Sequence, residues 1–335
     1  MATPLPLVRT STVRGACPHD CPDTCAMITT VEDGRAVRIQ GDPDHPITQG
    51  FLCAKVNRYL ERTYHPDRLQ HPLRRVGAKG EGRFEPVSWS DAIADIAERL
   101  HGVIEAHGAQ AILPYSYAGT MGYLQGESMD RRFFHTLGAS KLNRTICSAA
   151  GSAGMRMTVG ANVGADAESM PDCDLVLLWG TNTLTSNPHL WPFVLKAREN
   201  GAKIICIDPI RTRTAEQCDE WIAIRPGTDA ALALGIMHVL FREHLQDDDF
   251  IAKHTIGADQ LRVRAAEWTP ERTAATTGLA ADVIVSLAER YGRARNVFIR
   301  VNYGLQRHAG GGMAVRAIAC LPAITGHWRH AGGGV

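Results

Sequence analysis

The sequence has little of what marks a membrane or nucleic-acid-binding protein. Its 36 Lys and Arg balance 35 Asp and Glu, so no global field attracts nucleic acid or an anionic membrane. The longest apolar run, residues 230–241, contains His238 and is too short to span a bilayer. Residues 1–16 lack the continuous apolar stretch of a secretory signal. We therefore expect a cytoplasmic protein without a nucleic-acid partner and without direct membrane insertion.

Internal repeats and low-complexity linkers are also lacking. Hydrophobic residues make up 44% and charged residues 21% of the chain, which is typical of globular proteins and excludes disordered, collagen-like and coiled-coil chains. The length of 335 residues indicates about two domains.

Cysteine is unevenly distributed: four of the nine lie in the first 53 residues, with the spacing Cys-x3-Cys-x3-Cys-x27-Cys. A cytosolic chain keeps its thiols reduced, so this group indicates metal rather than disulfides. Three thiolates on one loop and a remote fourth suit the corners of a 4Fe-4S cluster. Structural zinc, which usually takes its ligands as two close pairs, is the alternative. The expected ligands are Cys17, Cys21, Cys25 and Cys53.

The cysteine-rich segment contains one readable hairpin. Residues 27–31 and 36–40 predict two strands, joined by a turn at Asp33-Gly34. A segment this small has a thin core, which a bound metal would reinforce. Lys55 follows Cys53 by two residues. It is either a solvated surface charge or a fixed cation between the cluster and a second redox centre.

From about residue 88 the pattern becomes α/β. A helix is expected from Ser90 to Val103 and a short strand over 111–115. Further on, the pattern predicts strands at 174–179, 203–207, 221–225 and 296–301, and helices at 190–200, 229–244, 282–291 and 314–325. The predicted fold class is α/β: a small β-containing segment, then a doubly wound, mostly parallel, Rossmann-like sheet. His327 and His330 are interpreted as surface residues.

The Gly-x-Gly-x-x-Gly fingerprint of NAD-binding proteins is absent. Instead, the loops 179–182, 208–212 and 225–229 combine backbone donors, hydroxyls, Arg and carboxylates. Phosphate favours Arg, hydroxyls and helix N-termini, and guanine presents adjacent N–H donors that a carboxylate can accept. Ordinary turns and caps are the alternative. Because ligands of such sheets bind at the carboxyl ends of strands, the three loops predict a nucleotide site.

In this order, the motifs resemble the molybdopterin oxidoreductases of the dimethyl sulfoxide reductase family, which includes formate dehydrogenases, nitrate reductases and thiosulfate or polysulfide reductases. The resemblance rests on residues 17–53, 51–55, 179–188, 201–212 and 225–229. It implies a 4Fe-4S cluster and molybdenum, or tungsten, held by two molybdopterin guanine dinucleotides. It implies a cluster domain at 1–58, the first part of a discontinuous α/β domain at 59–135, and a Rossmann-like dinucleotide-binding domain at 136–335.

The resemblance also assigns roles to residues. Lys55 would relay electrons between cluster and pterin. Cys147, with Asn143 four residues before it and Gly154 seven after, would bind the metal, since thiolate suits a soft, high-valent ion. Ser148 is the rival ligand, and a buried free thiol is the alternative for Cys147.

Two further loops resemble segments that touch the pterins in relatives: Tyr117–Gly122 and Tyr303–His308. Arg307 and His308 would contact phosphates or substrate, or form a solvated basic turn. The full set of expected cofactor contacts is Lys55, Gly119, Asn143, Gly180, Asn182, Asn187, Asp208, Pro209, Arg211, Thr212, Gly227, Thr228, Asp229, Tyr303 and Gly304.

The sequence also departs from the family pattern. Ser148 stands where formate dehydrogenases generally place His, and the chain ends at Val335 in what looks like a loop, before the family's C-terminal domains. We expect a fragment, a split subunit or a truncated gene product. The expected activity is two-electron redox of a small molecule, with electrons leaving to a ferredoxin-like or iron–sulfur partner. The alternatives are a non-catalytic electron-transfer subunit, an inactive fragment, and a zinc-stabilised nucleotide-binding module.

Overall fold

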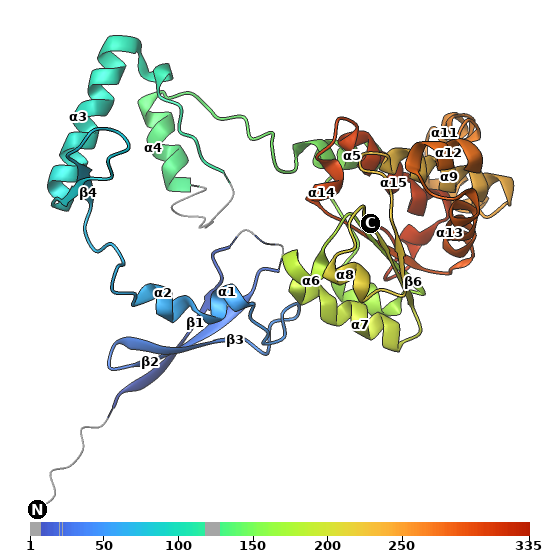
Figure 1. The fold of residues 1–335 in the computed structure, drawn as a ribbon, viewed down its shortest axis with the longest axis horizontal. Helices are drawn as coiled ribbons and strands as arrows, with labels where there is room; N and C mark the ends of the chain where they lie inside the picture. The colour runs from blue at the N-terminus through green and yellow to red at the C-terminus, as the bar shows by residue number, and fades with distance from the viewer. Residues whose placement is uncertain (1–7, 20, 22, 118–127) are drawn as a thin grey trace, which may run out of the picture. The chain divides into compact units, whose positions relative to one another are not determined.

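The computed structural model describes residues 8–19, 21, 23–117 and 128–335. The chain divides into two compact units, residues 1–144 and 145–335 (Figure 1). This division into two units does not test the predicted domain boundaries at residues 58 and 135, which stay predictions.

The first unit contains an antiparallel sheet of β1 (Thr10–Ala16), β2 (Ala26–Glu32) and β3 (Arg35–Gly41), in that order. The predicted hairpin is confirmed as β2 and β3. Asp33 and Gly34 both have positive φ, 46° and 81°, as a tight hairpin turn requires. β1 was not predicted, because all seven of its residues are exposed and its sequence lacks an apolar alternation.

The rest of the first unit consists of short elements around two longer helices. Ser88 caps α3 (Trp89–His107) by accepting a hydrogen bond from the Asp91 amide at 3.1 Å, so the predicted start at Ser90 is wrong. The strand predicted over 111–115 is also wrong, since η1 (Ala109–Ala111) and irregular chain occupy that stretch. The remaining elements are α1 (Ala54–Asn57), α2 (Tyr59–Thr63), β4 (Leu73–Arg75), β5 (Phe84–Pro86) and α4 (Asp130–Leu137).

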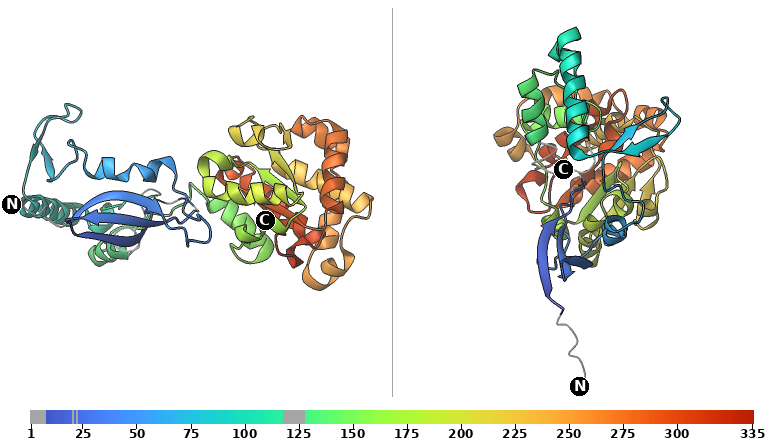
Figure 2. Two further views of the ribbon diagram at one scale, coloured as in Figure 1. Left: turned by 90° about the horizontal axis from the view of Figure 1, so that it is seen from below. Right: turned by 90° about the vertical axis from the view of Figure 1, so that its left-hand side faces the viewer.

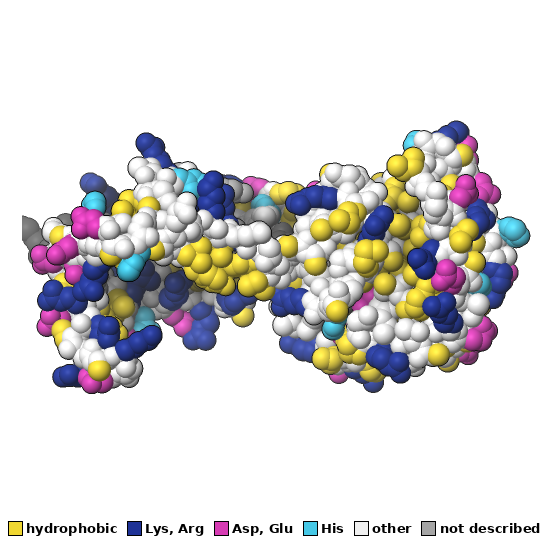
Figure 3. All heavy atoms as spheres, turned by 90° about the horizontal axis from the view of Figure 1, so that it is seen from above, with side chains coloured by type: hydrophobic (Ala, Val, Ile, Leu, Met, Phe, Trp, Pro, Cys, Tyr) yellow, Lys and Arg dark blue, Asp and Glu magenta, His cyan; other side chains and the backbone are white. Residues whose placement is uncertain are grey.

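Large hydrophobic side chains are exposed on this unit (Figure 3). Every residue of α3 is described and none is buried. Ile93 and Ile96, which lie on its predicted apolar face, are 61% and 56% exposed. The apolar stripe expected from the sequence is therefore present but uncovered within the described residues.

The second unit is built on a parallel sheet of β6 (Leu175–Trp179), β7 (Lys203–Ile207), β8 (Glu220–Ile222) and β9 (Val297–Val301), in the order β8-β7-β6-β9. This confirms the α/β class. The β6–β7 crossover is helix α7 (Trp191–Glu199), and Gly201 (φ 101°) supports the turn into β7. The glycine-rich end is irregular, as expected, except that Gly334 forms an isolated parallel bridge with Phe298 of β9.

Helices cover both faces of this sheet (Figures 1 and 2). On one face α5 (Ala149–Val159), α9 (Asp229–Arg242), α13 (Ala281–Arg293) and α15 (Gly311–Ile324) bury a core that includes Leu177, Ile205 and Ile299. α7 lies against β7. The other elements are η3 (Ala167–Asp172), α6 (Thr183–Ser186), η4 (Pro188–Leu190), α8 (Arg213–Glu216), α10 (Asp248–His254), α11 (Ala258–Ala266), α12 (Pro270–Thr277), α14 (Tyr303–Gln306) and η5 (His327–Arg329).

His327 corrects a prediction. Its side chain is only 2% exposed, and its ring nitrogens lie 2.9 Å from the Thr325 hydroxyl and 3.1 Å from the Ala294 carbonyl oxygen. The interpretation of His327 as a surface residue is therefore wrong, whereas His330 is exposed as expected. Among the residues that the structure describes, no helix is both long enough and apolar enough to cross a membrane.

Candidate functional site

The four N-terminal cysteines lie around one small core of the first unit. Cys25 is buried in it, and Cys17 and Cys53 pack against it. The amide of Cys17 donates a hydrogen bond to the carbonyl oxygen of Cys25 at 2.9 Å, which closes the loop that carries Cys21. The apolar members of the core are Met27, Leu52 and Val56.

Electrostatics indicates that the four thiols interact with one another. Burial raises the pKa of the Cys25 thiol to about 12, and the charges of Asp23, Cys17, Cys21 and Cys53 add to the shift. Within the described residues, no three Cys, His, Asp or Glu side chains are arranged to hold one metal ion. In a 4Fe-4S cluster each thiolate binds a different iron, so the ligands stand farther apart than around a single ion. Four cysteine thiols around one small core are the donors that such a cluster takes.

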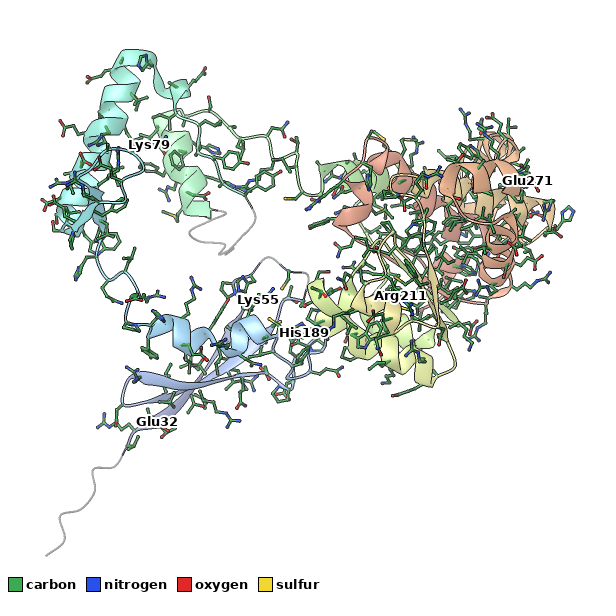
Figure 4. The ribbon with its side chains drawn as sticks, in the orientation of Figure 1. Glu32, Lys55, Lys79, His189, Arg211 and Glu271 are labelled. Carbon is green, nitrogen blue, oxygen red and sulfur yellow. The ribbon has the colours of Figure 1, made fainter. Side chains whose placement is uncertain are left out.

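Lys55 lies beside this group of thiols. Cys53 is the N-cap of α1, and its carbonyl oxygen accepts hydrogen bonds from the amides of Val56 and Asn57, each at 3.1 Å. Lys55 is on this first turn and its side chain is exposed (Figure 4). The pKa of the Cys21 thiol is raised, chiefly by burial, and the Lys55 ammonium opposes that rise. The cation therefore acts on the same cysteines that are predicted to bind the cluster.

In the second unit, two tryptophan indoles donate hydrogen bonds to residues that follow strands β7 and β8. The Trp179 indole, at the end of β6, donates to Oδ1 of Asp229 at 2.8 Å. The Trp221 indole, in β8, donates to the carbonyl oxygen of Asp208 at 2.8 Å. Because the strands are parallel, their carboxyl ends meet at one edge of the sheet. This edge contains the two carboxylates expected to bind guanine.

The same edge gathers ionisable groups. Burial raises the pKa of both Asp208 and Asp229. For Asp229 the hydrogen bond from Trp179 and the charge of His308 oppose the rise, while the charge of Asp208 adds to it. Asp208 and His308 therefore both lie within electrostatic range of Asp229, although His308 comes from a loop far along the chain.

The hydroxyl and amide side chains of these loops partly serve local structure. The Thr214 hydroxyl donates to Oδ1 of Asn182 at 2.8 Å. Thr212 caps α8 by accepting from the Ala215 amide at 3.2 Å, which is the ordinary capping role left open above. Thr228 donates to the Arg225 carbonyl oxygen at 2.7 Å instead of capping α9. Within the described part of the chain, the side chain of Thr228 therefore does not cap the first turn of α9, whose N-terminus is of the kind that binds phosphate.

The segment 303–308 contacts three of the predicted site loops through Leu305, Gln306 and His308. A Cβ on Gly180 (φ 62°) would lie 2.9 Å from the Cβ of Leu305, so only glycine allows this approach. Gln306 is hydrogen-bonded to Cys147 and Gly151. A Cβ on Gly227 would lie 3.4 Å from the ring of His308. One short segment therefore connects the Cys147 loop with the ends of β6 and β8.

Cys147 lies half-buried in a bend just before α5. Ser148, the N-cap of α5, makes no side-chain capping bond to the described residues. Gln306 was not among the predicted site residues. No sequence signal could identify it, because the contact joins positions 159 residues apart.

The other predicted residues are distributed as follows. Arg211 is exposed (Figure 4), with its guanidinium carbon 5.9 Å from the Trp221 ring centroid. Asn187 is buried. Gly119 lies outside the described residues. The exposed members of the set are Asn143, at the end of the first unit, and Pro209, Gly227, Tyr303, Gly304, Arg307 and His308.

Comparison with known proteins agrees with the family resemblance. Residues 10–65 match the molybdopterin oxidoreductase Fe4S4 domain and residues 68–335 match molybdopterin oxidoreductase. The chain is 48% identical to the "Probable oxidoreductase YoaE" of Bacillus subtilis (strain 168), over 96% of this chain and 47% of that protein. It is 34% identical to dimethyl sulfoxide reductase DmsA of Escherichia coli (strain K12), over 93% and 43%.

A solved structure also has the same fold. Acetylene hydratase from Pelobacter acetylenicus superposes with a TM-score of 0.79 at 28% identity, covering 93% of this chain and 43% of the other. The chain thus spans about half the length of the curated relatives it matches. The expected 4Fe-4S cluster and molybdopterin group are confirmed at the level of the family.

Proposed function

The chain belongs to the molybdopterin oxidoreductase family, and we propose that it is the cluster- and pterin-binding part of a two-electron oxidoreductase that acts on a small molecule. The observation that carries the proposal is the segment 303–308. It contacts the loop of the predicted metal ligand, Cys147, and the loops at the ends of β6 and β8. A non-catalytic electron-transfer subunit would not need a thiol held next to such a nucleotide-type edge.

When bound, molybdenum or tungsten on two molybdopterin guanine dinucleotides supplies the two-electron chemistry. The chain supplies position and charge. The Cys147 thiolate is the proposed protein ligand, with Ser148 as its rival. Asp208 and Asp229 would accept N–H groups of guanine, while Arg211 and the first amides of α9 would bind phosphate. Arg307 and His308 would donate hydrogen bonds to phosphate or substrate.

The further proposed contacts complete this arrangement. The family resemblance further assigns pterin contacts to Asn143, to Gly119, which lies outside the described residues, to the 180–187 loop, and to Tyr303 and Gly304. Cys17, Cys21, Cys25 and Cys53 would hold the cluster, which would supply one-electron transfer to a ferredoxin-like or iron–sulfur protein, and the exposed ammonium of Lys55 would favour its reduced form. We propose a cytoplasmic location, where the thiols of the four predicted cluster ligands would be kept reduced.

The dinucleotide assignment is tested by Asp229→Asn. Asparagine keeps an oxygen for the Trp179 indole, so the fold is retained, but it loses the carboxylate that accepts two adjacent guanine donors. We expect the bound guanine nucleotide, measured after acid release from protein purified without oxygen, to fall severalfold, since a buried polar contact is worth about 1–3 kcal/mol. Asp282→Asn, in the first turn of α13, is the matched control. Equal nucleotide contents in the two variants would refute this role of Asp229.

The metal assignment is tested in the longest natural form of the protein. Cys147→Ser should remove one sulfur scatterer from the molybdenum or tungsten absorption spectrum, because an oxygen donor replaces a thiolate. If Cys147→Ser left the ligand shell of the metal unchanged and Ser148→Ala altered it, the metal ligand would be Ser148 instead. Iron without molybdenum or tungsten would favour the electron-transfer subunit, and zinc without iron would favour the zinc-stabilised module.

A further inference from the structure

We propose that Gln306 is a positioning residue that holds the Cys147 segment in place through both ends of its carboxamide. This inference rests on the proposed role of Cys147 as the metal ligand, although its first test does not. Gln306 is the last residue of α14 and is only 7% exposed. Its amide nitrogen Nε2 donates to the carbonyl oxygen of Cys147, and its Oε1 accepts from the amide of Gly151.

These two bonds replace a missing local cap. The first N–H groups of a helix have no partner within the helix, and the Gly151 amide is one of them, in the first turn of α5. The side-chain oxygen of the N-cap residue, Ser148, would ordinarily accept a hydrogen bond from such an amide, but it makes no such bond to the described residues. Gln306 supplies that oxygen from α14, 155 residues along the chain, and the same carboxamide holds the backbone carbonyl of Cys147. The first turn of α5 and the backbone of Cys147 are thus held by one side chain.

The orientation of Gln306 is determined by close backbone packing. A Cβ on Gly311 would lie 1.9 Å from the carbonyl oxygen of Gln306, and a Cβ on Gly151 would lie 2.7 Å from its Oε1. The helices α5 and α15 approach each other through glycines as well: a Cβ on Gly154 would lie 2.3 Å from the carbonyl oxygen of Gly312. The glycine that follows Cys147 by seven residues therefore has a packing role, and the frame around Gln306 has little freedom to move.

Two variants separate the two bonds. Gln306→Met is close in volume and removes both, whereas Gln306→Glu keeps an acceptor for the Gly151 amide and loses the donor to Cys147. A hydrogen bond of this kind changes an opening equilibrium by about three- to tenfold. We expect iodoacetamide to alkylate Cys147 about three- to tenfold faster in both variants of the cofactor-free chain. Hydrogen exchange of the Gly151 amide should accelerate in Gln306→Met only.

The controls separate positioning from general loss of stability. Val239→Ala, in the buried part of α9, should lower the thermal midpoint without changing alkylation of Cys147, and alkylation of Cys320 should be unchanged in both Gln306 variants. The proposal would be overturned if Gln306→Met kept the native rates of Cys147 alkylation and Gly151 exchange. It would also be overturned if Val239→Ala raised these rates as much as Gln306→Met does. These measurements need no metal. If the absorption experiment showed that Cys147 does not bind the metal, the alkylation and exchange results for Gln306 would still stand. Failure of the proposed function and failure of this inference are therefore distinguishable.

Discussion

The two units of the chain are stabilised in different ways. In the second unit, one apolar core extends over all four strands and helices α5, α9, α13 and α15. In the first unit, the described core consists of Cys25, Met27, Leu52 and Val56, while the long helix α3 buries none of its described residues. Apolar burial is the main favourable term in folding. The second unit can therefore fold on its own core, whereas the first depends on what it binds or packs against.

The difference also explains where the predicted chemistry is placed. A cluster supplies cross-links that a thin core cannot, so its cysteines are in the unit with the smallest core. The proposed dinucleotide edge requires loops held at fixed positions, which a rigid parallel sheet provides. Each part of the proposed site thus lies on the unit whose stability suits it.

Removal of the cluster should give the largest effect. We expect Cys25→Ala, or chelation of iron in the native chain, to abolish protection from hydrogen exchange across β1–β3, because the cluster contributes folding free energy to this segment. Strands β6 and β7 should keep their protection. Cys320→Ala, in the second unit, is the control. Protection of β1–β3 that survives complete loss of iron would show that the first unit stands without its metal.

Truncation of one apolar residue in each unit should separate the two cores. Leu177→Ala, at a fully buried position in β6, should lower the free energy of unfolding of the second unit by about 2–5 kcal/mol. Ile93→Ala, at a position 61% exposed in α3, should change the stability of its unit by less than about 0.5 kcal/mol. Chemical denaturation of each variant measures both. Similar losses in the two units would mean that α3 is covered in solution.

The second unit should also lose stability in acid through His327. Burial lowers the pKa of this histidine to about 4, below its ordinary value of about 6.5. Between these values the unfolded chain binds a proton that the folded chain does not, so the free energy of unfolding falls as the pH falls. At about 1.4 kcal/mol per pH unit the loss approaches about 3 kcal/mol.

The matched variants are His327→Gln and His330→Gln. The first should flatten the decline in stability between about pH 6.5 and 4, because glutamine can still donate to the Ala294 carbonyl oxygen and does not titrate. The second replaces an exposed histidine and should keep the native profile. A His327→Gln profile parallel to the native one would assign the decline to other groups.

Lys55→Ala should have the smallest effect on stability, within about 0.5 kcal/mol, because the side chain is exposed. Its effect should be on the cluster: loss of a nearby cation disfavours the reduced state, so the reduction potential becomes more negative. Lys55→Arg should keep most of the native potential, and Lys79→Ala, which removes another exposed cation of the first unit, should keep all of it. A native potential in Lys55→Ala would return Lys55 to an ordinary surface charge.

The sheet of the second unit could be predicted because its strands are continuous apolar runs. β7 was predicted to the residue and β6 and β9 within one residue. Residues 111–115 have a similar local composition but no partner strand among the described residues. Composition alone therefore led to the wrong prediction of a strand there. The end of β8 and the start of α3 depended on caps and neighbours that short patterns do not specify.

The candidate site was predictable where it follows strand ends, and not where it depends on contacts between distant segments. The loops with Asp208 and Asp229 were located by the rule for parallel sheets. The bond between Trp179 and Asp229 and the approach of His308 to Gly227 require the folded chain. Gln306 and the buried ring of His327 belong to the same class, since burial and partners at large sequence separation are set by tertiary packing.

The glycine crossing of α5 and α15 limits how this protein can vary. A Cβ at Gly151, Gly154, Gly311 or Gly312 would lie within 3.0 Å of a neighbouring atom, and at all but Gly151 that atom is backbone. Gly310, next to them in sequence, has open space for a side chain. An engineer who wished to exchange Cys147 for another ligand would therefore have to leave these four glycines unchanged, because a side chain at any of them would displace the backbone or the Gln306 carboxamide that holds the Cys147 segment.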